Sequence, residues 1–265
     1  MMATTRTISA ASQLATVFST DLRRLLRARK TLVLLIVQFL PVIFAIVYIF
    51  YDEIDGLAIF SETVEGVVFP FLVPLAAVFY GGPALVDEME GRTLTYLLLR
   101  PISKPILYLG KWLASTAVAL GLVVLPVVVL LVLVMIAAGG MGGTSVGGIA
   151  QIIGATALGT ACYTAVFALL GALAAKSQFP GIIYYVIFEM IFPLFPILEL
   201  LSIRFHMRTA AGFNAAQRLG VLDKLIFDEP LHLGWWVGFL VLGGFCVLML
   251  GAGAAIFSSK QYQIK

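Results

Sequence analysis

Long apolar runs alternate with short polar segments along the whole chain. A helix needs about 20 apolar residues to cross the hydrocarbon core of a bilayer. Six runs have about this length, and each predicts a membrane-spanning helix: 31–51, 67–86, 112–137, 149–175, 180–201 and 234–257. Only a short polar segment with Lys176 and Pro180 divides the fourth run from the fifth, and these residues predict a turn there. The pattern predicts an all-α integral membrane protein with six spans within residues 31–257.

Composition supports this class and excludes others. Hydrophobic residues make up 61% of the chain and charged residues 12%, whereas soluble domains carry about 25% charged residues. Cys162 and Cys246 both lie inside apolar runs, and the chain has only two histidines. We therefore expect no disulfide framework and no metal site. No basic stripe interleaved with exposed aromatic residues occurs, so nucleic-acid binding is not expected.

Residues 1–30 differ in character from the six runs. Apolar residues recur there at steps of three and four, and arginines fall on the other faces. The apolar positions are Leu14, Val17, Phe18, Leu22, Leu25 and Leu26. This spacing predicts an amphipathic helix on the cytoplasmic face, with its basic residues near anionic lipid headgroups. The alternative is a basic tail without fixed structure.

The distribution of Lys and Arg predicts the orientation. Six lie in residues 1–30, four between the second and third runs, one at Lys176 and two in the tail 258–265. The opposite side has four, all in the loop 202–233, and none in 52–66 or 138–148. Basic residues concentrate on the cytoplasmic side of membrane proteins. We therefore expect both termini in the cytoplasm and 202–233 as an extracytoplasmic loop, in which 207–227 could form a short surface helix.

The most informative segment follows the second run. Three carboxylates, those of Asp87, Glu88 and Glu90, precede a leucine-rich turn that Pro101 and Pro105 end. Carboxylates favour a helix N-terminus, and proline stops a helix. The segment 87–105 therefore predicts a short cytoplasmic helix, tied to two spans, whose acidic side would suit a basic groove on a partner. The alternative is a solvated charge cluster at a helix end.

This segment resembles the signature of ABC-2-type transporter permeases. The resemblance rests on the runs Asp87-Glu88-Met89-Glu90-Gly91-Arg92-Thr93-Leu94, Tyr96-Leu97-Leu98, Arg100-Pro101-Ile102-Ser103 and Gly110-Lys111. It is closest to the branch of the nitrous-oxide-reductase and multi-copper enzyme maturation permeases. Lys104 stands where that branch more usually has Arg. The predicted architecture matches the family over the whole chain.

The resemblance implies a permease subunit that exports or extracts a substrate across a bacterial-type inner membrane. Such permeases are dimers, here expected to be homodimers, and a separate ATPase subunit binds ATP and Mg and docks on the cytoplasmic coupling helix. A periplasmic accessory protein and membrane lipid are further expected partners. The chain contains no phosphate-binding Gly-x-x-x-x-Gly-Lys-Ser/Thr loop, so we expect no cofactor on it. The coupling residues implied by the resemblance are Asp87, Glu88, Glu90, Arg92, Thr93 and Arg100.

Charged and broken positions inside the fifth run are candidates for the substrate pathway. Glu189 would lie near mid-membrane and Glu199 near the outer interface, with Tyr185 on the same helix. A charge at the bilayer centre costs several kcal/mol. Glu189 therefore lines the substrate pathway or the subunit interface, or it accepts a structural hydrogen bond, for example from Tyr163 or Thr164. Pro193 and Pro196 should kink or loosen the outer half of the fifth run, and prolines also interrupt the first and second runs. Neighbouring helices must then satisfy the freed backbone groups.

Two other classes of function are alternatives to the permease. A secondary transporter or channel could use Glu189 as a proton site, but the chain shows no inverted repeat. A membrane-embedded enzyme is suggested only by Asp52-Glu53-Ile54-Asp55-Gly56, which superficially resembles the opening of a phosphatidyltransferase motif and lacks the rest of it. A neighbouring reading frame that encodes a P-loop ATPase would favour the permease over both.

Overall fold

Helices satisfy their own backbone hydrogen bonds, which long apolar segments require where their surroundings offer no water. The computed structural model describes residues 9–51, 56–83, 86, 103–137, 145–174, 179–213 and 233–259, and all regular structure within these ranges is helical. The helices are α1 Ala10–Leu26, α2 Arg29–Tyr51, α3 Gly56–Thr63, η1 Val64–Leu72, α4 Val73–Gly81, α7 Lys104–Ala137, α8 Val146–Leu173, α9 Phe179–Tyr184, η2 Tyr185–Ile191, η3 Phe192–Leu194, α10 Pro196–Glu199, α11 Ile203–Ala210 and α13 Trp235–Ser259.

Five helical segments of the described chain are long and apolar enough to cross a membrane. They are Arg29–Val47, Ile59–Gly81, Lys104–Ala137, Val146–Leu173 and Trp235–Ser259. Each overlaps one of the predicted runs, although α7 starts at Lys104 and so extends beyond the run that was expected from residue 112. The remaining run, 180–201, forms a shorter apolar helix, Phe179–Leu194, followed by α10.

Two prolines cause the break in this shorter segment. The helix tightens to a 3-10 turn at Phe192–Leu194, which contains Pro193, and Phe195 is extended with φ −118° and ψ 123°. Pro196 then starts the four-residue helix α10. Proline has no N–H to continue the helical hydrogen bonds. The structure therefore has the loosened second half that the sequence predicts for the fifth run.

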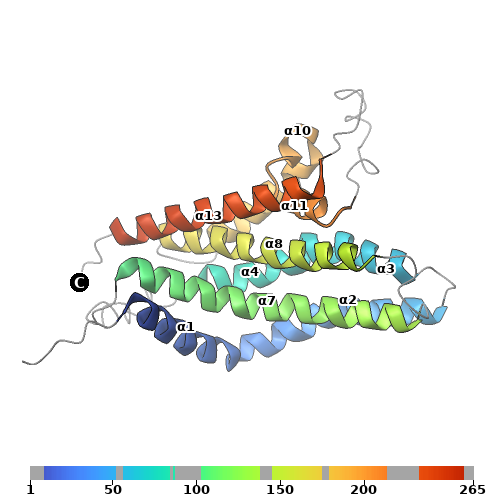
Figure 1. The fold of residues 1–265 in the computed structure, drawn as a ribbon, viewed down its shortest axis with the longest axis horizontal. Coiled ribbons are helices and arrows are strands. Elements are labelled where there is room, and N and C mark those ends of the chain that lie inside the picture. Colours follow the sequence, from blue (N-terminus) through green and yellow to red (C-terminus); the bar gives the residue numbers. More distant parts are fainter. Residues whose placement is uncertain are drawn as a thin grey trace, which may run out of the picture.

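The long helices lie side by side along the long axis of the molecule (Figure 1). α8 packs against α13, α4 and α7, while α11 lies against α13 and α8. We call the part of the bundle around α1 the α1 end, and the other part, which includes α3, α10 and α11, the α11 end (Figure 1). The first residues of α7 and the last of α13 lie at the α1 end, and the last of α7 and the first of α13 lie at the other (Figure 1). Consecutive spans therefore alternate in direction.

Side chains from other helices satisfy carbonyl groups that prolines leave free. The carbonyl of Pro70 faces Pro74 four residues on, and the Tyr185 hydroxyl donates to it at 2.6 Å. The carbonyl of Phe79 likewise faces Pro83, and Lys30 Nζ lies 3.4 Å from it. Because proline cannot donate, these contacts replace bonds of the helical ladder. Neighbouring helices thus satisfy the freed carbonyl groups, as the positions of the prolines predict.

α1 is bound to the bundle by its apolar side. Ser9 caps its first turn through a bond from Ser12 N at 3.3 Å. Val17, Asp21 and Leu25 are buried, and α1 packs along α7. The amphipathic helix predicted for residues 1–30 thus has an apolar side that faces protein, while Leu26 at its end is exposed.

Candidate functional site

The residues assigned to ATPase coupling lie outside the described part of the chain. These are Asp87, Glu88, Glu90, Arg92, Thr93 and Arg100. The structure does describe the segments on both sides, α4 with Gly82 and Pro83 before them and α7 from Lys104 after them. How these flanking segments are held determines what a movement of residues 87–105 could do to the bundle.

A buried ion pair joins α1 to α7 immediately after this region. Lys111 is 2% exposed, and its Nζ lies 2.8 Å from Asp21 Oδ2. Arg24, on the next turn of α1, lies 3.4 Å from the other oxygen of Asp21. A charge this deeply buried is tolerated only with a partner in good geometry, so the ion pair fixes the position of α1 along α7.

The residue before Lys111 allows this close approach. Gly110 faces Val17, and a Cβ at Gly110 would lie 2.7 Å from Val17 Cγ1. Only glycine therefore lets the two helix backbones come this near. The Gly110-Lys111 pair of the sequence signature acts here as the docking point of α1. We call Asp21, Arg24, Val17, Gly110 and Lys111 the α1 clasp.

The turn between α1 and α2 is fixed to the end of α4. Thr31 Oγ1 donates to the Leu25 carbonyl at 2.6 Å and accepts from the Tyr80 hydroxyl at 2.8 Å. Lys30 Nζ lies 5.4 Å from the centre of the Tyr80 ring, within the range of a cation–π interaction. At the start of α7, Lys104 Nζ donates to the Ser258 carbonyl of α13 at 3.2 Å. Both segments that flank residues 84–102 are thus fastened to several helices.

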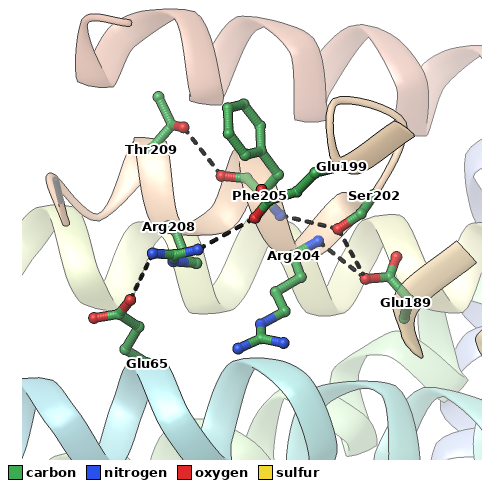
Figure 2. A network of polar contacts seen from close by, with 8 residues as sticks. All are labelled: Glu65, Glu189, Glu199, Ser202, Arg204, Phe205, Arg208 and Thr209. Carbon is green, nitrogen blue, oxygen red and sulfur yellow. Dashed lines mark hydrogen bonds and ion pairs between the residues drawn. The ribbon is translucent and has the colours of Figure 1, made fainter. Parts of the chain in front are cut away.

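At the α11 end, Glu189 binds the N-terminus of α11. Its carboxylate accepts hydrogen bonds from Ile203 N at 2.9 Å, Arg204 N at 3.3 Å and Ser202 Oγ at 3.1 Å (Figure 2). Glu189 is 4% exposed. The first N–H groups of a helix have no partner within the helix and attract negative charge. Glu189 supplies that charge from η2, and Ser202 completes the cap by accepting from Phe205 N at 3.1 Å.

Thr164, which was a possible partner of Glu189, pairs elsewhere. Its hydroxyl lies 2.7 Å from the Thr116 hydroxyl of α7. Tyr163, the other possible partner, is fully buried, and its hydroxyl interacts electrostatically with Glu189 without forming a hydrogen bond of regular geometry. The hydrogen bonds that Glu189 does accept come from α11, which the sequence pattern did not indicate.

Arg208 joins three elements at the same end. Its guanidinium lies 2.8 Å from Glu65 Oε1 on η1 and 3.3 Å from Glu199 Oε1 on α10 (Figure 2). Arg208 is 6% exposed. A buried guanidinium between two carboxylates holds both through charge-assisted contacts. Glu199, a candidate for the substrate pathway, therefore lies in an ion pair within the protein.

Arg204 and His206 complete this group of polar residues on α11. The Arg204 side chain extends away from the Glu189 carboxylate, on the side of α11 that faces the helix carrying Glu65 (Figure 2). His206 Nε2 lies 2.9 Å from the Leu200 carbonyl. Burial lowers the pKa of His206, which keeps its ring neutral near pH 7. The positive charge of this group therefore comes from the two arginines. We call Glu65, Glu189, Glu199, Ser202, Arg204 and Arg208 the α11 cluster.

α11 fits tightly against α13. A Cβ at Gly238 would lie 2.5 Å from Ala210 N and 2.6 Å from the His206 carbonyl. On its other side α11 contacts α8. The short helix is therefore fixed by backbone contact as well as by Glu189 and Arg208. It starts at Ile203, earlier than the surface helix 207–227 that the sequence indicated, and most of that range lies outside the described residues.

Comparison with known proteins identifies the family of this helical bundle. The family model described as ABC-2 family transporter protein matches residues 15–261. The chain belongs to the ABC-2 transporter family. A search of the curated proteins gave no match. The chain is therefore a multi-pass membrane component of an ABC-type transporter and not its catalytic subunit, and the match includes both the α1 clasp and the α11 cluster.

In this ABC-2 chain, the structure brings together some of the site residues predicted from the sequence and adds further residues to the site. Glu189 and Glu199 meet at α11, and Tyr185 lies nearby but binds the Pro70 carbonyl instead. Asp21, Glu65 and Arg208 are new. Asp21 could have been noticed as an acid on the apolar side of a basic helix. Among the described residues, no three His, Cys, Asp or Glu side chains gather closely enough to hold a metal ion.

Proposed function

We propose that this chain is the permease subunit of an ABC transporter whose ATPase is a separate polypeptide. Family membership supports the permease assignment, and the sequence has no phosphate-binding loop of its own. The proposed transporter contains two permease subunits, as a homodimer, and two ATPase subunits that bind ATP and Mg. It exports or extracts its substrate. The resemblance of its sequence signature supports the branch of the enzyme-maturation permeases, in which a periplasmic accessory protein would be a partner.

The α1 clasp is the observation that carries this proposal. The ion pair Asp21–Lys111 of the clasp, together with the contacts Tyr80–Thr31 and Lys104–Ser258, connects the segments that flank residues 84–102 to α1, α2 and α13. A push on the segment 87–105 would therefore move these helices together instead of bending one loop. This arrangement suits a coupling device, because packed helices respond to a local displacement by shifting as rigid bodies.

The α11 cluster is proposed as the part of the permease that responds at the opposite face. Glu189 holds the first turn of α11, and Arg208 ties α11 to η1 and α10. η1 continues into α4, which ends at the coupling region. A shift of α4 would thus reach Arg208 through Glu65. In this proposal Glu189, Glu199 and Tyr185 shape the substrate pathway by holding broken helices in place.

The orientation in this proposal follows from the Lys and Arg distribution. The α1 end faces the cytoplasm and the α11 end faces outward, with both termini inside. The ATPase then reaches residues 87–105 from the cytoplasm, where ATP is available. Six spans per subunit require the helix Phe179–Leu194 and the following α10 to count together as one broken span.

Charge reversal in the coupling segment tests the proposal. The double substitution Glu88→Lys and Glu90→Lys should abolish co-purification of the ATPase with the tagged permease from native membranes, because the acidic side would repel a basic groove. The ATPase is identified by mass spectrometry as a P-loop protein and by its ATP hydrolysis. The yield of permease in the membrane should not change.

A matched control keeps the charge at the same positions. Glu88→Asp with Glu90→Asp should retain the ATPase at close to the wild-type amount. If the lysine variant still co-purifies with the ATPase, or if wild-type permease brings down no P-loop protein, the coupling assignment is wrong.

A further inference from the structure

A lateral groove runs between α2 and the segment α3–η1. It has a volume of about 590 Å³, within the range of ligand-binding sites in proteins. Leu40, Pro41 and Phe44 line it from α2, and Glu62, Val67 and Leu72 line it from the other side. Leu40, Phe44 and Val67 are 43%, 71% and 38% exposed. In a membrane-spanning bundle, exposed apolar side chains at mid-span face lipid tails, so the groove opens towards the bilayer.

Irregular backbone on both sides creates the groove. Pro41 interrupts the hydrogen-bond ladder of α2, and η1 is a π-helix that contains Pro70. Proline kinks a helix and a π-helical turn widens it. The two helices therefore separate here.

The length of the groove corresponds to one leaflet of a bilayer. Leu72 lies ten residues after Glu62, which corresponds to at most about 15 Å, the length of ten residues of α-helix. The hydrocarbon core is about 30 Å thick, so one leaflet contributes about 15 Å. Glu62 lies near the start of the span Ile59–Gly81, at the depth of the headgroups, and Leu72 lies near the middle of the bilayer.

The charge of the groove determines which phospholipid headgroup it favours. Of the described residues that line the groove, Glu62 alone carries a charge, and its side chain is exposed. Thr63 beside it adds a hydroxyl. A carboxylate at headgroup depth repels anionic phosphatidylglycerol and attracts a primary ammonium group, which also donates hydrogen bonds to it.

We propose that this groove binds one acyl chain of a phospholipid whose ammonium headgroup pairs with Glu62, as in phosphatidylethanolamine. Apolar burial of the chain supplies most of the affinity. The ion pair with Glu62 supplies the headgroup preference. This lipid site binds without ATP or the ATPase.

Native mass spectrometry of the purified permease tests the site directly. The protein is incubated with equal amounts of phosphatidylethanolamine and phosphatidylglycerol of identical acyl chains. Wild type should retain phosphatidylethanolamine about two- to fivefold more, as one exposed ion pair would give. Glu62→Gln should remove the preference while retention of lipid continues, and Glu62→Lys should reverse it.

A bulky residue in the groove tests chain binding. Val67→Trp should fill the groove and lower retention of both lipids. Val247→Trp is the matched control, because Val247 is 70% exposed on α13, away from the groove. Two results would overturn the proposal: equal retention by Val67→Trp and Val247→Trp, or no headgroup preference in wild type.

A second copy of the permease is the competing occupant of the groove. Val67→Cys in native membranes distinguishes the two with a short bifunctional thiol reagent. A monomeric product agrees with lipid in the groove, and efficient crosslinking between two copies at this cysteine would show that protein covers it. Since no arm of these tests uses the ATPase, failure of the lipid site and failure of the transport proposal give different results.

Discussion

At the residue scale, the buried charged groups of the described bundle are organised in pairs and caps that connect different helices. Glu189 was identifiable from the sequence as a charge in an apolar run, because nothing else nearby interrupts the hydrophobicity. Its partners were not identifiable. Hydrophobic periodicity gives the face on which a residue lies, whereas the N-terminus of α11 reaches Glu189 only through the break at Pro193 and Pro196.

The Asp21–Lys111 pair makes a quantitative prediction. Lys111→Met should lower the free energy of unfolding by about 2 kcal/mol, because Asp21 would stay buried with only the exposed Arg24 near it. The double variant Asp21→Leu with Lys111→Met should recover more than half of this loss, since no charge is then buried. Thermal unfolding of the detergent-solubilised protein measures both. A double variant that is no more stable than Lys111→Met would show that the pair is not the main contact of α1.

Glu189 distinguishes a structural role from a role in the substrate pathway. Glu189→Ala should lower the free energy of unfolding by about 3 kcal/mol, because the N–H groups of Ile203 and Arg204 lose their acceptor in a buried place. Glu189→Gln keeps one acceptor oxygen and should cost about 1 kcal/mol. Thermal unfolding and ATP turnover of the complex are measured together. Unchanged stability of both variants with lost turnover would instead indicate direct contact with substrate.

At the element scale, the sequence predicted the long helices but not the start of the short helix α11. The apolar runs predicted the long helices because each needs only length and hydrophobicity. Pro193 and Pro196 also predicted the loosened outer half of the fifth run, whereas α2 continues through Pro41 as one helix. The start of α11 was missed, since the helix has eight residues and its first turn is held by Glu189 from another element. The Ser202 cap was its one local signal.

Glycine substitutions on α13 test how closely α11 packs against α13. Replacing glycine by alanine inside a helix normally stabilises it by about 0.5–1 kcal/mol. Gly238→Ala should do the opposite, because its Cβ would meet the backbone of α11 at Ala210 and His206. Gly243→Ala is the matched control on the same helix, where a Cβ meets nothing within 4 Å. Melting temperatures should fall for the first and stay equal or rise for the second, and equal changes would contradict the seating of α11.

At the scale of the whole molecule, the buried ion pairs of the described residues form two groups in different parts of the bundle. The α1 clasp holds helices together at one end, and the α11 cluster holds broken helices at the other. The segments between them are packed apolar helices, in which Tyr163 and Phe167 of α8 are fully buried. The sequence predicted a helical membrane protein with a special segment at 87–105. It could not show that α1 and α7 share a buried ion pair, because residues 21 and 111 are related only through the folded structure.

The central claim is that a separate ATPase, acting at residues 87–105, moves elements at the α11 end. The most direct measurement is the rate at which a thiol reagent labels Leu201→Cys, which lies between α10 and α11 and is 58% exposed in the wild type. Cys162 and Cys246 are buried, so they contribute little background. With the ATPase bound, ATP should change the labelling rate, and neither ATP alone nor the Glu88→Lys, Glu90→Lys variant should do so. A rate that stays constant while the bound ATPase hydrolyses ATP, or that responds to ATP without the ATPase, would contradict the account.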